Sequence, residues 1–297
     1  MNEILMILNP AAGGGRCADD ARELARSHGW KLQETAESGD ARRLAAKLGS
    51  SAPGTIVAAG GDGTINEVIN GLMEHREDAR PRLGILPCGT ANDFVKLQRP
   101  GLRWKEAVAA ILKGQGRKFD LAEVSGGRRH HFANAATGGI SAEIHERLDD
   151  GAKSWWGSFS YFRIAAKIIP RAAVYEARVK AGNRSFEGRA MALMIANGRH
   201  AGGVKLLPNA DPTDHHLDVA VVKAETLAEL SALLAQFAVG KHEESAHFWL
   251  AKAREIEVEC DPAMTFIGDG EALGETPLRF RVIPGAIEIC TPPGPPA

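Results

Sequence analysis

Cysteine is scarce in this sequence of 297 residues, and the four cysteines that occur are far apart. They are Cys17, Cys88, Cys260 and Cys290, and no two of them have the CxxC spacing of a zinc site. So few scattered cysteines also exclude the disulfide framework of small secreted domains. We therefore predict four reduced thiols, no zinc site and a cytoplasmic protein.

The sequence also lacks an excess of charge of one sign and a long hydrophobic run. The formal net charge is −1 and the pI is about 6.8, which gives no electrostatic reason to expect a nucleic-acid partner. No apolar run is long enough to span a membrane. The apolar residues 1–8 are not preceded by a basic region or followed by a cleavage site, so we do not expect a signal peptide.

The sequence does contain a strand, a glycine turn and a helix in direct succession at residues 55–72. Residues 55–59 are apolar and partly β-branched, which is typical of a buried parallel strand. Apolar residues then recur at helical spacing from Ile65 to Leu72. Thr64 and Glu67 have the spacing of a capping box, so we expect the helix to begin directly after the turn.

The glycine turn reads Gly60-Gly61-Asp62-Gly63-Thr64. Glycine lets the backbone N–H groups approach a ligand closely, and the N-terminus of the following helix favours an anion such as phosphate. Because a bare carboxylate repels phosphate, Asp62 indicates a cation such as Mg²⁺ or a contact with a hydroxyl. An ordinary tight turn explains a lone glycine pair better, whereas the complete string with its strand and helix favours a phosphate site.

The two halves of the chain have different patterns. Residues 1–124 alternate strands and helices, which predicts a Rossmann-like parallel sheet with helices on both faces. Residues 125–297 contain mainly short alternating strands, which predict an antiparallel β-sandwich or distorted barrel. The expected fold class is thus α/β plus β. Loops near residues 9–15, 60–64 and 87–93 follow parallel strands and should meet at the carboxyl edge of the sheet.

Four motifs combine in this chain: Asn9-Pro10 with its glycine loop, Gly60–Thr64 with Asn66-Glu67, Gly89-Thr90-Ala91-Asn92-Asp93, and Gly268-Asp269-Gly270-Glu271. Together they resemble the diacylglycerol kinase catalytic family, in particular its soluble bacterial lipid kinases, over most of the chain. NAD kinases share the GGDGT string and phosphofructokinases carry a relative of it, so the combination is more specific than any one motif. The resemblance implies a first domain of the phosphofructokinase and NAD kinase type.

The resemblance further implies transfer of the γ-phosphate of ATP to a hydroxyl of diacylglycerol or a related lipid, with Mg²⁺, in a cleft between the domains. The lipid would be drawn from the membrane surface, so peripheral membrane contact is expected, and a homodimer is expected from the family. The residues implied to bind nucleotide and Mg²⁺ are Asn9, Thr35, Gly60, Gly61, Asp62, Gly63, Thr64, Glu67, Thr90, Asn92, Asp93 and Asp120.

Asp269 is the predicted general base, since it lies on a tight turn between two glycines. A base that accepts the hydroxyl proton contributes about 10²–10⁴-fold in rate. Glu271 would share the acidic surface, and Asp62 would act beside the phosphates. A solvent-exposed acid in a two-glycine hairpin is the alternative.

The family also carries a structural Mg²⁺ site, and its acidic segment matches residues 211–218. By position Asp214 would supply a carboxylate, and Asp211 and His216 would supply further oxygens. His215 stands where glycine is common, which leaves a loop of acids without metal as an alternative.

Three further questions stay open from the sequence. An NAD kinase would use the same GGDGT chemistry on a soluble dinucleotide, and a nucleotide or lipid sensor would need no base. Aromatic residues between 155 and 162 could meet acyl chains or simply pack a helix onto the core. The identity of the lipid cannot be read from these motifs.

Overall fold

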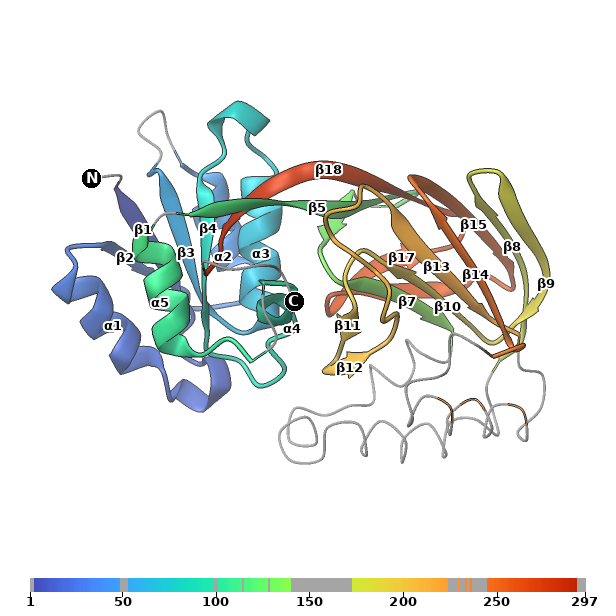
Figure 1. The fold of residues 1–297 in the computed structure, drawn as a ribbon, viewed down its shortest axis with the longest axis horizontal. Helices are drawn as coiled ribbons and strands as arrows, with labels where there is room; N and C mark the ends of the chain where they lie inside the picture. The colour runs from blue at the N-terminus through green and yellow to red at the C-terminus, as the bar shows by residue number, and fades with distance from the viewer. Residues whose placement is uncertain are drawn as a thin grey trace. The chain divides into compact units, whose positions relative to one another are not determined.

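The computed structural model describes residues 3–48, 53–98, 101–113, 115–127, 129–139, 173–223 and 245–292, with residues 229, 233 and 236. The chain divides into two compact units (Figure 1). The first unit comprises residues 1–121 and 284–297, and the second comprises residues 122–283. The aromatic residues between 155 and 162 lie outside the described residues.

A parallel sheet forms the centre of the first unit. Its strands are β1 (Ile4–Leu8), β2 (Lys31–Glu34), β3 (Thr55–Gly60) and β4 (Arg82–Pro87), in the spatial order β2-β1-β3-β4. Every residue of β3 is buried, because helices cover both faces of the sheet (Figure 1). The predicted Rossmann-like α/β architecture is confirmed.

The helices of the first unit alternate with these strands. They are α1 (Ala18–Ser27), α2 (Asp40–Ala46), α3 (Asp62–Leu72), α4 (Asp93–Gln98) and α5 (Trp104–Lys113), with 3-10 turns η1 (Ala12–Gly15) and η2 (Glu77–Ala79). The buried face of α3 includes Ile65, Val68, Ile69 and Leu72, as the helical spacing predicts.

The start of α3 differs from the expectation. The helix begins at Asp62, inside the glycine string, and its N-cap Gly61 makes no side-chain cap hydrogen bond. Thr64 and Glu67 do not form a capping box, because both side chains are used elsewhere. Thr64 Oγ1 accepts a hydrogen bond from Asn9 Nδ2, and the Glu67 carboxylate accepts hydrogen bonds from the backbone N–H groups of Gly39 and Ala41.

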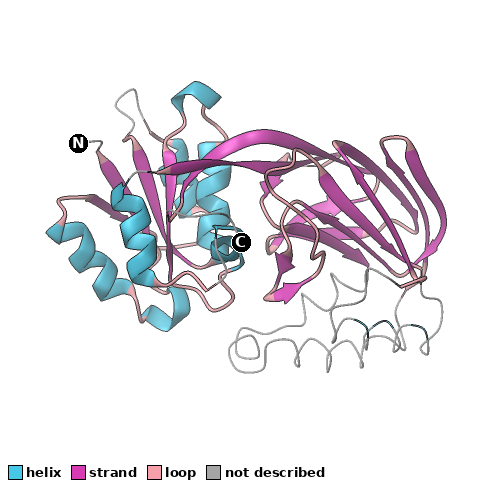
Figure 2. Ribbon diagram, in the orientation of Figure 1, coloured by secondary structure: helices cyan, strands magenta, loops and turns pink. Residues whose placement is uncertain are grey.

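The second unit is built from antiparallel strands (Figure 2). Among the described residues one sheet has the order β14-β13-β10-β7-β16-β17, and the strands β18-β15-β8-β9 form another layer. The described strands that follow α5 are β5 (Gly116–Ser125), β6 (His130–Phe132), β7 (Ala135–Gly139), β8 (Tyr175–Ala181), β9 (Arg184–Ala190), β10 (Ala192–Ala196), β11 (His200–Ala201), β12 (Val204–Lys205), β13 (Leu217–Val222), β14 (Phe248–Ala253), β15 (Glu255–Asp261), β16 (Thr265–Gly268), β17 (Glu271–Glu275) and β18 (Leu278–Cys290).

The core of the second unit lies between these two layers. Leu193 of β10 and Val258 of β15 belong to the same buried cluster. Phe280 links them further, with ring centroids 6.2 Å from Phe132 and 5.4 Å from Phe266. Because side chains from both sheets interdigitate, the unit is the predicted antiparallel sandwich.

The chain passes between the units within β5 and within β18. The first part of β18 pairs with β15, and Ile289 near its end pairs in parallel with Leu83 of β4. Residues 284–297 therefore belong to the first unit, although the sequence pattern assigned the whole range 125–297 to the second. A strand of 13 residues that changes its neighbours cannot be recognised from alternation alone.

Across the part of the chain that the structure describes, no helix is both long and apolar enough to cross a bilayer.

Gly71 provides a test of the contact between α2 and α3. A Cβ atom at this position would lie 2.4 Å from the carbonyl oxygen of Arg42 and 2.7 Å from Cβ of Ala45. We expect Gly71→Ala to lower the free energy of unfolding by about 1–3 kcal/mol, because the overpacked helices must move apart. Gly63→Ala in the same helix is the control, since nothing lies within 4 Å of its added Cβ. Equal denaturation midpoints for Gly71→Ala and the wild type would contradict this packing.

Candidate functional site

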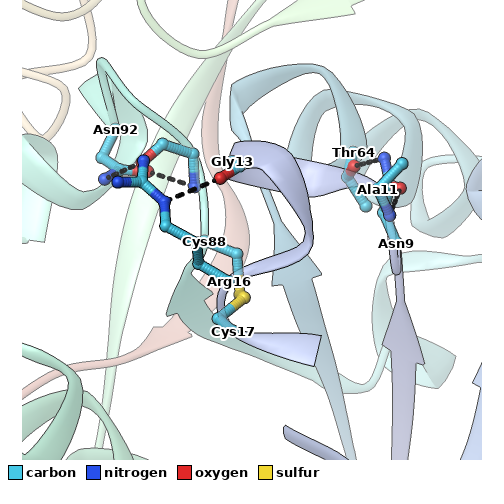
Figure 3. The surroundings of a disulfide bond; sticks show 9 residues. Asn9, Ala11, Gly13, Arg16, Cys17, Thr64, Cys88 and Asn92 are labelled. Carbon is cyan, nitrogen blue, oxygen red and sulfur yellow. Dashed lines mark hydrogen bonds between the residues drawn. A yellow bond between two sulfur atoms is a disulfide. The ribbon is translucent and has the colours of Figure 1, made fainter. Parts of the chain in front are cut away.

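Three loops meet at the carboxyl edge of the parallel sheet, as predicted. Asn9 follows β1, and its Nδ2 donates to Oγ1 of Thr64, 3.1 Å away, in the first turn of α3 (Figure 3). The N–H of Cys88, which follows β4, donates to the carbonyl of Gly60 at the end of β3. The predicted convergence of these three loops is therefore confirmed within the first unit.

Glycine is required where these loops touch. A Cβ atom on Gly89 would lie 2.7 Å from Cα of Gly61, and one on Gly13 would lie 2.2 Å from the carbonyl oxygen of Cys88. Gly13 also has a φ of +60°, which side chains disfavour. At Gly60 the side chain of Thr64 takes the space, 2.5 Å from the position of an added Cβ. These glycines allow backbone N–H groups of three loops to gather at one place.

The third loop is held in shape by Asn92. Its φ of +50° is left-handed, and its side chain makes two hydrogen bonds with Gly89, from Gly89 N to Oδ1 at 3.0 Å and from Nδ2 to the Gly89 carbonyl at 2.9 Å. The amide of Asn92 thus supports the loop itself. Thr90, between these two residues, is exposed. Whether Thr90 and Asn92 contact a nucleotide stays a prediction.

Two carboxylates come together where the second and third loops meet. Asp62 Oδ1 accepts a hydrogen bond of 3.1 Å from the N–H of Phe94, the residue after Asp93. Burial, and then the charge of Asp93, raise the pKa of Asp62 from its ordinary value to about 6. Lys96, one turn along α4, donates to Asp93 Oδ1 at 2.7 Å and lies close enough to oppose that rise. The spacing of three residues between Asp93 and Lys96 in a helix is a sequence signal that could have predicted the ion pair between these two residues.

Three other residues that were predicted to bind the nucleotide make contacts within the first unit. Asp120 is buried, and its Oδ1 accepts a hydrogen bond of 2.7 Å from the N–H of Gly285. The Glu67 carboxylate binds the start of α2 through Gly39 and Ala41. Thr35 follows β2, and its N–H donates to the carbonyl of Leu8. These contacts position the residues structurally, and their contact with a nucleotide stays a prediction.

A disulfide joins two of the converging loops (Figure 3). Cys17, just after η1, is bonded to Cys88, with Cα atoms 5.8 Å apart and a separation of 71 positions in the sequence. The prediction of four reduced thiols is therefore wrong for this pair, while Cys260 and Cys290 are free. Spacing in sequence could not reveal the bond, because the sheet brings the two loops together.

In the second unit, Asp269 lies on the turn between β16 and β17. Its φ is +47°, and its half-buried carboxylate accepts hydrogen bonds from three consecutive backbone N–H groups, at 2.8 Å from Ala133, 3.2 Å from Asn134 and 3.3 Å from Ala135. Glu271, two residues further on, is exposed. Asp269 is thus a firmly oriented acid, which differs from the freely solvated acid of an ordinary hairpin.

The loop predicted to hold a structural Mg²⁺ is stabilised by its own contacts. Asp214 Oδ2 lies 2.6 Å from Nζ of Lys252, whose ammonium group also pairs with Asp218 at 3.2 Å. Asp214 Oδ1 accepts a hydrogen bond from the N–H of His216, and Asp211 Oδ1 binds Thr213. The ammonium group of Lys252 thus lies beside the carboxylates of Asp214 and Asp218, one of which was expected to bind the metal ion. The structural Mg²⁺ site stays a prediction.

His215 occupies the left-handed conformation that glycine favours at that position. Its φ is +62°, a backbone conformation that residues other than glycine disfavour. Across the described residues, no group of three or more His, Cys, Asp or Glu side chains could hold a metal ion.

The raised pKa of Asp62 gives a pH-dependent test. Asp62 binds its proton more tightly in the folded chain than in the unfolded chain, where its pKa is 3.8. Its ionisation therefore lowers the free energy of unfolding progressively from about pH 4 to about pH 6. The full cost is reached above about pH 6, and there is none below about pH 4. Asp62→Asn should therefore raise the free energy of unfolding of the nucleotide-free protein by up to about 3 kcal/mol at pH 8. The gain should shrink as the pH falls towards 4. Asp19→Asn, at an exposed position of α1, is the control. A gain that does not depend on pH would contradict the assignment.

The disulfide gives a second test. Cys17→Ser should lower the stability of the first unit by up to about 4 kcal/mol, because it releases a long loop in the unfolded chain. A dithiol reductant should have the same effect on the wild type and none on the variant. Thiol titration of the denatured, unreduced protein should find two free cysteines, Cys260 and Cys290. Titration of all four would contradict the bond.

Comparison with known proteins agrees with both units. Residues 3–124 match the diacylglycerol kinase catalytic domain, and residues 134–291 match the YegS C-terminal NAD kinase beta sandwich-like domain. Among solved structures, a Bacillus anthracis protein described as a candidate diacylglycerol kinase superposes with a TM-score of 0.83 at 26% identity, over 98% of this chain and 96% of its own. An NAD kinase from Archaeoglobus fulgidus, solved with ATP, has a TM-score of 0.56 at 12% identity over 97% and 94% of the two chains, a likeness of fold alone.

Sequence relatives extend over nearly the whole chain. A Yersinia enterocolitica protein named probable lipid kinase YegS-like is 35% identical over 300 residues, 99% of this chain and 98% of its own. A Yersinia pestis protein of the same name is 33% identical over 296 residues, with the same coverage. The chain therefore belongs to the YegS-like family of lipid kinases, with a diacylglycerol kinase catalytic domain followed by a YegS C-terminal domain.

Proposed function

We propose that this protein transfers the γ-phosphate of ATP to a hydroxyl group of diacylglycerol or a related lipid. The observation that carries the proposal is the contact of three glycine-bearing loops at the carboxyl edge of the parallel sheet. Backbone N–H groups at the start of α3, with the partial positive charge of that helix end, suit a phosphate chain. Membership of a lipid kinase family supports a lipid acceptor.

Asp62 and Asp93 are the proposed residues for Mg²⁺. Mg²⁺ is commonly bound by one or two carboxylates, with phosphate oxygens and waters as its other ligands. The two carboxylates fit this role, because the charge of Asp93 contributes to the raised pKa of Asp62 and a divalent cation would relieve that repulsion. Such an ion would arrive with the nucleotide and neutralise charge on the transferred phosphoryl group.

Asp269 is the proposed general base. A lipid hydroxyl oxygen attacks the γ-phosphorus, the bond from the γ-phosphorus to the bridging oxygen breaks, and ADP leaves. The hydroxyl proton passes to the Asp269 carboxylate, which needs a lone pair directed at the substrate. Three N–H donors fix the carboxylate, so its orientation is set before the lipid binds. Glu271 adds negative charge nearby.

Phosphate-transfer assays distinguish the remaining candidates. The protein is incubated with γ-labelled ATP, Mg²⁺, NAD and vesicles that contain diacylglycerol, phosphatidylglycerol or a total lipid extract, and the products are partitioned between organic and aqueous phases. Label in the organic phase is the expected result. Label on NAD alone would select an NAD kinase, to which the fold is related, and no transfer at all would favour a nucleotide or lipid sensor. The proposed membrane contact is tested by sedimentation, in which the fraction of the protein that pellets with the vesicles is measured for each lipid composition.

The role of Asp269 is tested by Asp269→Asn. The substituted amide keeps one oxygen acceptor for the backbone donors, so we expect a folded protein. We expect kcat to fall by about 10²–10⁴-fold, because the amide cannot take up the hydroxyl proton. Asp261→Asn, an exposed position at the end of β15, is the matched control. Turnover of Asp269→Asn close to that of the control would rule out Asp269 as the base.

A further inference from the structure

Asn197 lies directly behind the backbone segment that binds the Asp269 carboxylate. It follows β10 and is fully buried. Its Nδ2 donates a hydrogen bond of 2.8 Å to the carbonyl oxygen of Ala133. Its own N–H and the N–H of Gly198 both donate to the carbonyl of Asn134, each at 2.8 Å. Asn197 therefore binds the carbonyl side of the segment whose N–H groups face Asp269.

The two sets of hydrogen bonds share the same peptide groups. The carbonyl of Ala133 and the N–H of Asn134 belong to one peptide unit, so Asn197 Nδ2 and Asp269 Oδ2 bind its opposite ends. The carbonyl of Asn134 and the N–H of Ala135 belong to the next unit, which Asn197 N and Asp269 Oδ1 bind in the same way. Hydrogen bonds in such a chain polarise and strengthen one another.

Strand pairing fixes this arrangement. β10 pairs antiparallel with β7, with Ala196 opposite Ala135, so Asn197 comes next to Asn134 just beyond the last pair. β16 pairs with β7 from the other side, with Gly268 opposite Ala136, which brings Asp269 to Ala135. The N–H of Asp269 donates to the carbonyl of Ala135 at 3.3 Å. Residues 133–135 thus lie between Asn197 and Asp269 at the same end of one sheet.

We propose that Asn197 is a positioning residue for phosphoryl transfer, which acts on Asp269 through the peptide groups of residues 133–135. The inference rests on the proposed function, because it assigns Asn197 a role in orienting the general base. Without the Nδ2 donor, the carbonyl of Ala133 is buried without that partner and the segment can tilt. The N–H groups then reach Asp269 with poorer geometry, so the carboxylate loses both orientation and stabilisation of its negative charge.

Asn197→Ala is the test variant, because it removes the Nδ2 donor and places no new charge near Asp269. We expect kcat for lipid phosphorylation to fall by about 10- to 100-fold, as for a small displacement of a reacting group. The KM for ATP should stay within about twofold of the wild type, because the nucleotide is assigned to the first unit. Asn197→Leu, which has a similar volume and no donor, serves the same purpose if the alanine variant does not fold. Ser245→Ala is the matched control, since it removes a hydrogen bond of another buried side chain in the second unit, from His247 N to Ser245 Oγ.

A titration separates positioning from a merely structural role. The ¹³C signal of the Asp269 carboxyl group, assigned by its loss in Asp269→Asn, is followed against pH in the wild type and in the Asn197 variants. Weaker N–H donors should move its midpoint to higher pH. Glu271, the nearest acidic residue in the sequence, is present in both proteins and serves as an internal reference. A midpoint that does not move, with or without a fall in kcat, would overturn the inference.

The same experiment keeps the two proposals apart. If the wild type phosphorylates no lipid but the Asp269 midpoint still depends on Asn197, the coupling between the two residues stands and the proposed function fails. If the wild type is an active lipid kinase and the variants match Ser245→Ala in both kcat and midpoint, the proposed function stands and the role of Asn197 fails.

Discussion

Close backbone contact between loops is the constraint on which the first unit depends. The loops after β1, β3 and β4 approach one another so closely that Gly13, Gly60 and Gly89 leave no room for a Cβ atom. Hydrogen bonds then lock the loops together, from Asn9 to Thr64 and from Cys88 to Gly60. A side chain at any of these glycines would separate the loops, so the choice of residue there decides whether their N–H groups can gather around one anion.

The two carboxylates to which we assign functional roles are held in physically opposite ways. Asp62 is buried near another acid, which raises its pKa and leaves its negative charge incompletely compensated. Such a group is suited to an incoming cation. Asp269 instead receives three backbone hydrogen bonds, which compensate its charge and fix its direction. Such a group is suited to accurate placement against a substrate. A kinase needs both, because it must neutralise phosphate and orient an acceptor hydroxyl.

Features that depend on neighbouring residues could be predicted from the sequence, and features that depend on distant contacts could not. β3 includes the predicted residues 55–59, because a short apolar run with β-branched residues is a local signal. The convergence of the loops followed from the rule that parallel strands share a carboxyl edge. The partners of Glu67 are 26 and 28 residues away, so its apparent capping box was misleading. The Cys17–Cys88 bond and the segment 133–135 behind Asp269 required the three-dimensional pairing of strands.

The course of β18 has a consequence for how the protein is made. Ile289 pairs with Leu83, so a strand of the N-terminal sheet is supplied by almost the last described residues of the chain. During synthesis on the ribosome, the first 121 residues emerge long before this strand does, and β4 waits with an unpaired edge. Domains usually fold as they emerge, but here the first unit can be completed only after all of the second unit, residues 122–283, has been synthesised. A truncated chain would thus expose an edge that invites aggregation.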